Sequence, residues 1–178
     1  MVSLIGSKVE RKEDKKFLTG KGRYTADINL VHQTYAYFVR SPHARAKIKN
    51  VDISKALKSP GVVKIFTGED IAREKIGGLI AGWKIVSQDG KDMKVPNHPP
   101  LAKDTVNYVG DHVAIVIAET LQEAKIASEL VNVSYTKQKA VVKTNEAIQS
   151  ENIHEGIDQN ICFDFVLGDK AKTEDSFS

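Results

Sequence analysis

Cysteine is almost absent from this chain, which has 178 residues and a single thiol, Cys162. One cysteine cannot close an internal disulfide, and it cannot supply the several thiolates of a zinc or iron–sulfur site. Histidine pairs are missing too, because no two histidines stand three or four residues apart to share a helical face around a metal. The five are His32, His43, His98, His112 and His154. A reducing compartment, the cytoplasm, fits this composition.

Long apolar runs and blocks of like charge are also missing. No window approaches the roughly 18–20 apolar residues of a membrane-spanning helix, and the first eight residues are too short an apolar stretch for a signal peptide. We therefore expect a protein that is neither exported nor embedded. The net charge is +3, but acids and bases alternate along the chain. The most cationic stretch, residues 8–21, also holds Glu10, Glu13 and Asp14, which argues against nucleic-acid binding.

What is present is the composition of a folded domain, with 41% hydrophobic and 28% charged residues. Residues 1–30 show no sustained period and are predicted to form an extended arm. A domain is predicted for residues 31–150. It begins with two alternating segments that indicate strands, and these are followed by one helical turn, a third strand and a capped helix. The segments are 34–39, 46–53 with a bulge near Asn50, the turn at 54–61, the strand at 62–66 and the helix after Thr67.

The second half of this domain contains the clearest signals. A loop or hairpin rich in Gly, Asp, Asn and Pro is predicted for residues 77–100, with Trp83 as an apolar anchor that favours burial. Residues 113–118 form a continuous apolar run, Thr120 and Glu123 make a capping box, and alternation resumes at 131–135. The pattern predicts a β-α-β unit in a mixed sheet, and hence an α+β fold. Further predictions are a strand near 141–142, a helix at 145–149, and a tail over 151–178 with a strand at 161–167 before a linker.

Several residues that could carry chemistry have a plainer structural interpretation. Gly20 and Gly22 lack the flanking strand and helix of a phosphate loop, so a tight bend is favoured. His43 follows a strand end, where a turn-stabilising or interface role is favoured. The carboxylates at 13–14 and at 69–70 are adjacent in sequence, so each pair is expected to point apart into solvent. Cys162 lies between Ile161 and Phe163, an apolar setting that favours a packed core or interface cysteine over a nucleophile. We predict no catalytic, cofactor-binding or metal-binding residue.

Four segments, taken in order, resemble one family. They are FLTGKGRY at 17–24 with Asp27, FVRSPHARAKI at 38–48, PGVV at 60–63 with TGED at 67–70, and YVGDHVA at 108–114. They are similar to the first part of the molybdopterin-binding large subunit of carbon monoxide dehydrogenase, aldehyde oxidase and xanthine dehydrogenase relatives. Arg45, Asp111 and His112 depart from the family's pattern, as does Ala26.

The resemblance implies an α/β-hammerhead domain that precedes molybdenum-cofactor domains, in an oxidoreductase that hydroxylates aldehydes, carbon monoxide or heterocycles with water as the oxygen source. It implies molybdopterin in the complete enzyme, and iron–sulfur clusters and FAD on partner subunits. The family's cofactor loops and glutamate base match nothing in this sequence, so we expect a structural and assembly role, without cofactor binding or activity by the chain alone. The tail at 151–178 would then lead toward the cofactor domains.

Two other functions stay open. The chain could be a free-standing binding or regulatory module that kept the hammerhead fold, which the neighbouring reading frame would reveal. A nucleic-acid binder using residues 8–21 is less favoured, and it would show strongly salt-dependent binding. The substrate is not defined by these residues.

Overall fold

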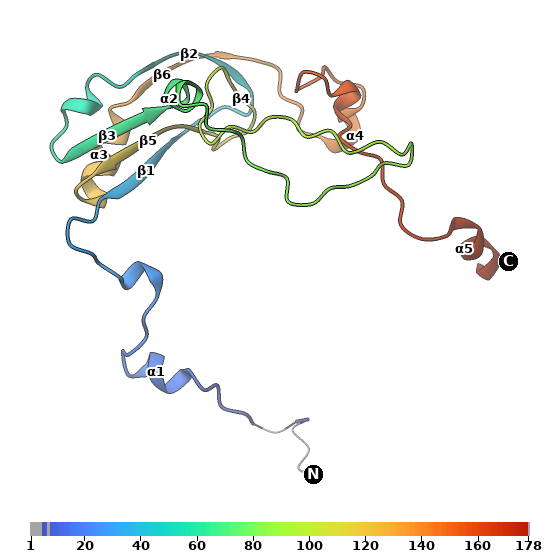
Figure 1. Cartoon of the computed structure of the whole chain (residues 1–178), viewed down its shortest axis with the longest axis horizontal. Helices are drawn as coiled ribbons and strands as arrows, with labels where there is room; N and C mark the ends of the chain where they lie inside the picture. The colour runs from blue at the N-terminus through green and yellow to red at the C-terminus, as the bar shows by residue number, and fades with distance from the viewer. Residues whose placement is uncertain (1–4, 7, 178) are drawn as a thin grey trace. The chain divides into compact units, whose positions relative to one another are not determined.

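The computed structural model describes residues 5, 6 and 8–177, so the ends of the predicted arm and tail lie outside the description. The chain divides into two units, residues 1–33 and 34–178. In the first unit, a short helix α1 (Asp14–Leu18) and a 3₁₀ turn η1 (Thr25–Asp27) interrupt an otherwise irregular chain (Figure 1). Gly20 follows α1 with φ +69°, and its N–H donates to the Phe17 carbonyl. This is a helix-terminating glycine, which agrees with the bend expected there.

The second unit holds two three-stranded antiparallel sheets with the orders β1-β5-β3 and β4-β2-β6. The strands are β1 (Tyr35–Arg40), β2 (Ala46–Asp52), β3 (Val62–Thr67), β4 (Thr105–Val106), β5 (His112–Ala118) and β6 (Asn132–Lys137). The helices are α2 (Gly68–Arg73), α3 (Leu121–Glu129), α4 (Thr144–Ala147) and α5 (Lys170–Phe177), with 3₁₀ turns η2 (Ala56–Lys58) and η3 (Asp158–Asn160).

The larger core lies between α3 and the β1-β5-β3 sheet (Figure 1). Its buried residues are Ala56, Ile65, Ala114, Val116, Ala118, Ala124 and Ala127. The buried residues of α3 are all small, which lets the helix lie close against the strands. A second core cluster joins β5 to the other sheet through Ala46, Ala102, Val106 and Val113. The strand β5 therefore contributes to both cores, which explains its continuous apolar run.

Most of the local predictions in this unit are confirmed. The three strands predicted between residues 34 and 66 appear as β1, β2 and β3, and the β2 ladder shifts register between Ile48 and Asn50. Both expected caps form, with Thr67 and Asp70 at α2 and Thr120 and Glu123 at α3. The turn after β2 is a 3₁₀ helix, and the Asp52 side chain accepts from the Ser54 N–H at 2.9 Å.

The predicted α+β class is confirmed, but the sheet pairing differs from the expected mixed sheet. Strand, helix and strand follow one another as β5, α3 and β6, yet β5 and β6 belong to different sheets. The reason is that β1 and β3 already pair with both edges of β5. The chain that leaves α3 must therefore pair elsewhere, and β6 joins β2 in an antiparallel ladder.

Two predicted strands were wrong. Residues 141–142 are irregular, because the β2–β6 ladder has already ended at the pair Ala46 and Lys137. Residues 161–167 alternate in sequence but form no ladder. Instead the Cys162 and Asp164 carbonyls accept single backbone hydrogen bonds, each 2.9 Å, from Lys94 and Gln88 of the long loop.

The tail and the loop complete the description of this unit. Part of the predicted linker is helical, since α5 begins after Asp169, whose side chain accepts from the Lys172 N–H at 3.1 Å. The loop at 77–100 is irregular apart from one bridge between Val86 and Asp92. Trp83, expected to be buried, is 80% exposed within the described residues. No helix among the described residues is long and apolar enough to cross a membrane.

Candidate functional site

Two turns that are distant in sequence are joined at one end of the β1-β5-β3 sheet. The first follows β1 at Ser41, and the second precedes β5 at Gly110 and Asp111. The Ser41 N–H donates to the Asp111 carbonyl and the Gly110 N–H donates to the Ser41 carbonyl, both at 2.8 Å. Gly110 has φ +94°, a backbone conformation that favours glycine. The two turns therefore hold each other in a fixed position.

Asp111 is the buried charge at this junction, with 6% of its surface exposed. Its Oδ2 accepts a hydrogen bond of 2.9 Å from the Asn107 backbone N–H. A buried carboxylate needs such donors, because removal from water otherwise disfavours the charged form. The side chain thereby orders the residues between Asn107 and β5.

A cavity of about 210 Å³ lies beside Asp111. It is lined by Pro96, Asn97, His98, Pro99, Ala102, Thr105, Asn107, Tyr108, Asp111 and His154. These residues come from the end of the long loop, from the chain around β4, and from the segment after α4. A concave site with several convergent polar groups is the arrangement expected of a small-ligand site.

Tyr108 and His98 form one wall of this cavity. Their rings meet edge to face, with centroids 6.0 Å apart and an interplanar angle of 89°, and the Tyr108 hydroxyl lies 3.4 Å from His98 Nε2. Burial raises the pKa of Tyr108, and the negative charge of Asp111 raises it further. The phenol therefore stays protonated at neutral pH and acts as a hydrogen-bonding group.

Two other histidines near the cavity have lowered pKa values. Burial lowers the pKa of His112, and the neighbouring Arg40 adds to this effect. Burial also lowers the pKa of His154, with a further contribution from Arg45. Both imidazoles are therefore neutral at physiological pH.

His43 has the turn-stabilising contacts that the sequence favoured. Its backbone N–H donates to Ser41 Oγ at 3.0 Å, and its ring packs edge to face on Tyr135 with centroids 4.9 Å apart. The neighbouring Arg45 reaches the Asn152 and Ile153 carbonyls through its Nη2, at 3.4 Å each. The segment at 41–45 thus joins β1, β6 and the segment after α4.

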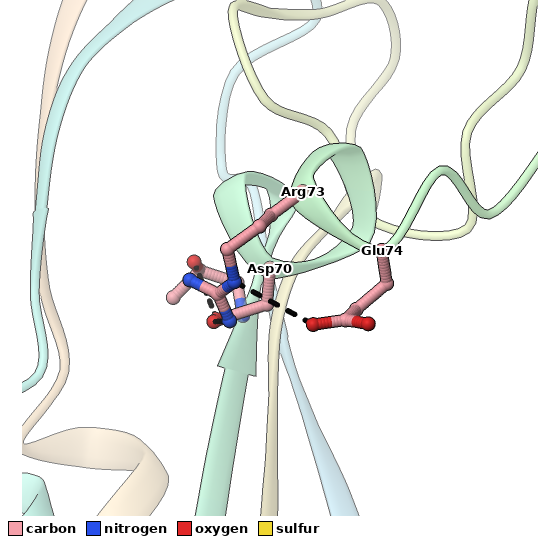
Figure 2. A network of polar contacts seen from close by, with 4 residues as sticks. Asp70, Arg73 and Glu74 are labelled. Carbon is pink, nitrogen blue, oxygen red and sulfur yellow. Dashed lines mark hydrogen bonds and ion pairs between the residues drawn. The ribbon is translucent and has the colours of Figure 1, made fainter.

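The adjacent carboxylates Glu69 and Asp70 belong to a capping network. Figure 2 shows Arg73 of α2 between Asp70 and Glu74, with N–O distances of 2.6 Å and 3.5 Å. Burial acts to raise the pKa of Asp70, but the hydrogen bonds from Thr67 and Arg73 outweigh it, so the pKa lies below 3.8. Glu69 turns away and pairs with Lys103 at 3.3 Å. Their different partners indicate structural roles.

Sequence reasoning did not anticipate the cavity. The sequence offers these residues only separately: His98 and His154 are unpaired histidines, and Tyr108 and Asp111 belong to the segment at 108–114 that resembles the family. No signal within one segment could have joined them, because the site depends on long-range packing. Among the described residues, no group of three or more His, Cys, Asp or Glu side chains is arranged to hold a metal ion. Cys162 is a partly buried free thiol.

Two antiparallel sheets, with α3 packed on the first, define an α+β domain of the hammerhead class. The sequence pattern of the family described as "Aldehyde oxidase and xanthine dehydrogenase, a/b hammerhead domain" matches residues 19–139. The chain belongs to this family.

Curated relatives and solved structures agree with this assignment. The chain is 37% identical to the nicotine 6-hydroxylase large subunit of Paenarthrobacter nicotinovorans over 86% of its length, which corresponds to 18% of that protein. It is 30% identical to the carbon monoxide dehydrogenase large chain of Afipia carboxidovorans, over 98% of this chain and 22% of that one. Its fold is similar to quinoline 2-oxidoreductase from Pseudomonas putida 86, with TM-score 0.73 and 33% identity over 83% of this chain and 18% of the other. The chain thus spans about a fifth of the length of these relatives.

Proposed function

We propose that this chain is the hammerhead part of a molybdenum hydroxylase large subunit and that its role there is structural, without catalytic residues of its own. Enzymes of this family use molybdopterin, iron–sulfur clusters and FAD. In this proposal the molybdenum cofactor is held by the remainder of the large subunit, and the iron–sulfur clusters and FAD by partner subunits. The complete cytoplasmic enzyme would hydroxylate an aldehyde, carbon monoxide or a heterocycle with oxygen from water.

The observation that carries the proposal is the set of large apolar side chains left exposed on residues 34–178 of a chain that matches about a fifth of its relatives. On the long loop, Ile80 is 93% exposed and Trp83 is 80% exposed. On the tail, Phe165 is 52% and Leu167 is 89% exposed. Large apolar side chains gain free energy when a partner covers them, which supports a role in packing against the rest of a larger subunit.

The division of labour along the chain is part of the proposal. Residues 1–30 would form an arm that packs on the cofactor domains or on neighbouring subunits. Residues 31–150 would form the hammerhead domain, and residues 151–178 would form the connection toward the cofactor domains. The described residues support no metal-ligating group of their own, as noted above. The carboxylates of Asp70 and Asp111 accept backbone hydrogen bonds in a helix cap and in a turn, which fits a structural part.

The experiment is reconstitution with the rest of the large subunit. The double variant Ile80→Ser and Trp83→Ser is compared with Gln88→Ser, a polar change in the same loop at a residue that donates its backbone N–H to the Asp164 carbonyl. We expect the double variant to weaken association at least tenfold and to lower oxidation activity in step, while Gln88→Ser matches the unmodified chain. No association of the unmodified chain, and no effect on activity, would favour a free-standing binding or regulatory module instead.

A further inference from the structure

We infer that the cavity beside Asp111 binds a guanidinium or amidinium group, a planar cation that carries several N–H donors. The lining contains one carboxylate, Asp111, and no lysine or arginine. Its volume of about 210 Å³ is sufficient for such a group on a short aliphatic stem. This inference does not depend on the role proposed above, because every residue that carries it lies within residues 96–154.

The polar groups of the cavity offer more acceptors than the chain itself satisfies. Asp111 Oδ2 accepts from the Asn107 N–H and the carboxylate also interacts with the Tyr108 side chain, which still leaves lone pairs on a carboxylate that is 6% exposed. Asn107 Oδ1 is buried and has no hydrogen-bond partner among the described residues. A buried acceptor without a donor is unfavourable, so a ligand toward which the Asn107 side chain turns gives it that missing hydrogen bond. A forked planar donor can reach two acceptors at once.

The aromatic wall favours a flat cation over a compact one. Tyr108 and His98 both line the cavity, and their rings stand at 89° to each other. Guanidinium groups stack on aromatic faces and lose little hydration when they do so, whereas an ammonium is a strongly hydrated point charge.

Two resident cations oppose this binding and limit its strength. Arg40 and Arg45 lie close enough to affect the neighbouring histidines, but neither lines the cavity. Their guanidinium groups donate to backbone carbonyls, Arg40 to Gly110 at 3.2 Å and Arg45 to Asn152 at 3.4 Å. We therefore expect a dissociation constant of about 1 mM for a small guanidinium compound, a value that its few heavy atoms permit.

The test is an NMR titration of the isotope-labelled chain with ethylguanidinium, and with N-ethylurea as the neutral compound of the same shape. Millimolar concentrations stay far below the molar range in which guanidinium unfolds proteins. Ethylguanidinium is expected to shift the amide signals of Asn107, Tyr108 and His154, with at least tenfold tighter binding than N-ethylurea. Equal binding of the two compounds, or shifts confined to other regions, would overturn the inference.

Two variants separate binding from folding. Asp111→Asn removes the charge but retains an acceptor for the Asn107 N–H, and it should weaken ethylguanidinium binding about tenfold. Asn107→Leu keeps the backbone donor and replaces the side-chain amide, both the unpartnered Oδ1 acceptor and the Nδ2 donor, with an apolar group of similar size. It should weaken binding several-fold without loss of fold. Binding that survives in a folded Asn107→Leu variant and in Asp111→Asn refutes the assignment.

The guanidinium group could belong to a free small molecule or to an arginine of the chain that completes the enzyme. Repeating the titration on the reconstituted complex separates these sources. An arginine that fills the cavity would abolish ethylguanidinium binding in the complex, whereas a small-molecule site would keep it. If no complex forms, the role proposed above fails, while the titration of this chain alone still decides the inference.

Discussion

Replacing Gly68 by alanine tests whether the start of α2 packs as closely on the backbone of residues 102–103 as the structure describes. A methyl group at this position would meet backbone atoms of Ala102 and Lys103, at distances that a Cβ atom does not tolerate. Backbone cannot rotate away as the end of a flexible side chain can, so the segment after the long loop must move. That segment includes the buried residues Leu101 and Ala102.

The magnitude follows from two opposing effects. Alanine is favoured over glycine in a helix by at most about 1 kcal/mol. Overpacking in a close contact costs about 1–3 kcal/mol, and the upper part of this range applies because the neighbour is backbone. We expect a net loss of about 1–2 kcal/mol from the free energy of unfolding. In urea this loss lowers the midpoint by about 1 M, given a slope of about 1–3 kcal/mol per molar.

Gly77 provides the matched control. An added Cβ there meets nothing within 4 Å, and the residue is not among the glycines with positive φ. Gly77→Ala should leave stability unchanged or raise it by about 0.4–1 kcal/mol. Urea unfolding followed by circular dichroism measures both variants. A Gly68→Ala variant as stable as Gly77→Ala would refute the close approach of α2 to residues 102–103.

Two further predictions concern the helix caps. Thr120→Ala removes the acceptor of the Glu123 N–H, a bond of 3.2 Å, and should cost about 1 kcal/mol in thermal or urea unfolding; a change within error would contradict the capping role. Asp70→Asn should destabilise the chain most at neutral pH, because the lowered pKa of Asp70 contributes stability above its ordinary value of 3.8. This contribution is lost as pH falls through the folded-state pKa. The difference in free energy of unfolding between the variant and the unmodified chain, measured from pH 7 to pH 2.5, should therefore shrink below pH 3.8. A difference that stays constant over this range would count against the pKa shift.

The sequence predicted elements whose signals are local. The apolar run at 113–118 and the Thr120 capping box are each signals contained within a few residues, and they indicate β5 and α3. Strand pairing is a long-range property, and there the predictions failed. Alternation at 161–167 resembles a half-buried strand, but a strand also needs a partner with free donors and acceptors, and that segment receives only isolated bonds from the long loop. The pairing of β6 with β2 could not be read from either segment alone.

The candidate site escaped sequence reasoning for the same reason. The cavity combines Asp111, Tyr108, His98 and His154, which the chain brings together only when β5 pairs with β1 and the long loop folds back. Each residue by itself has an ordinary structural interpretation. Asp111 in particular serves as a hydrogen-bond acceptor within its turn and as the charged wall of the cavity, and only the folded geometry shows both contacts.

Residues in the segments that identify the family make contacts that join parts of the fold. Ser41 and Gly110 join two turns by paired backbone hydrogen bonds, and Gly68 permits the close approach of α2 to Ala102. Asp70 closes the cap of the same helix. These residues lie in three of the four resembling segments, and each of them controls how one part of the chain meets another. In these three segments, therefore, the architecture of the domain alone accounts for the residues named.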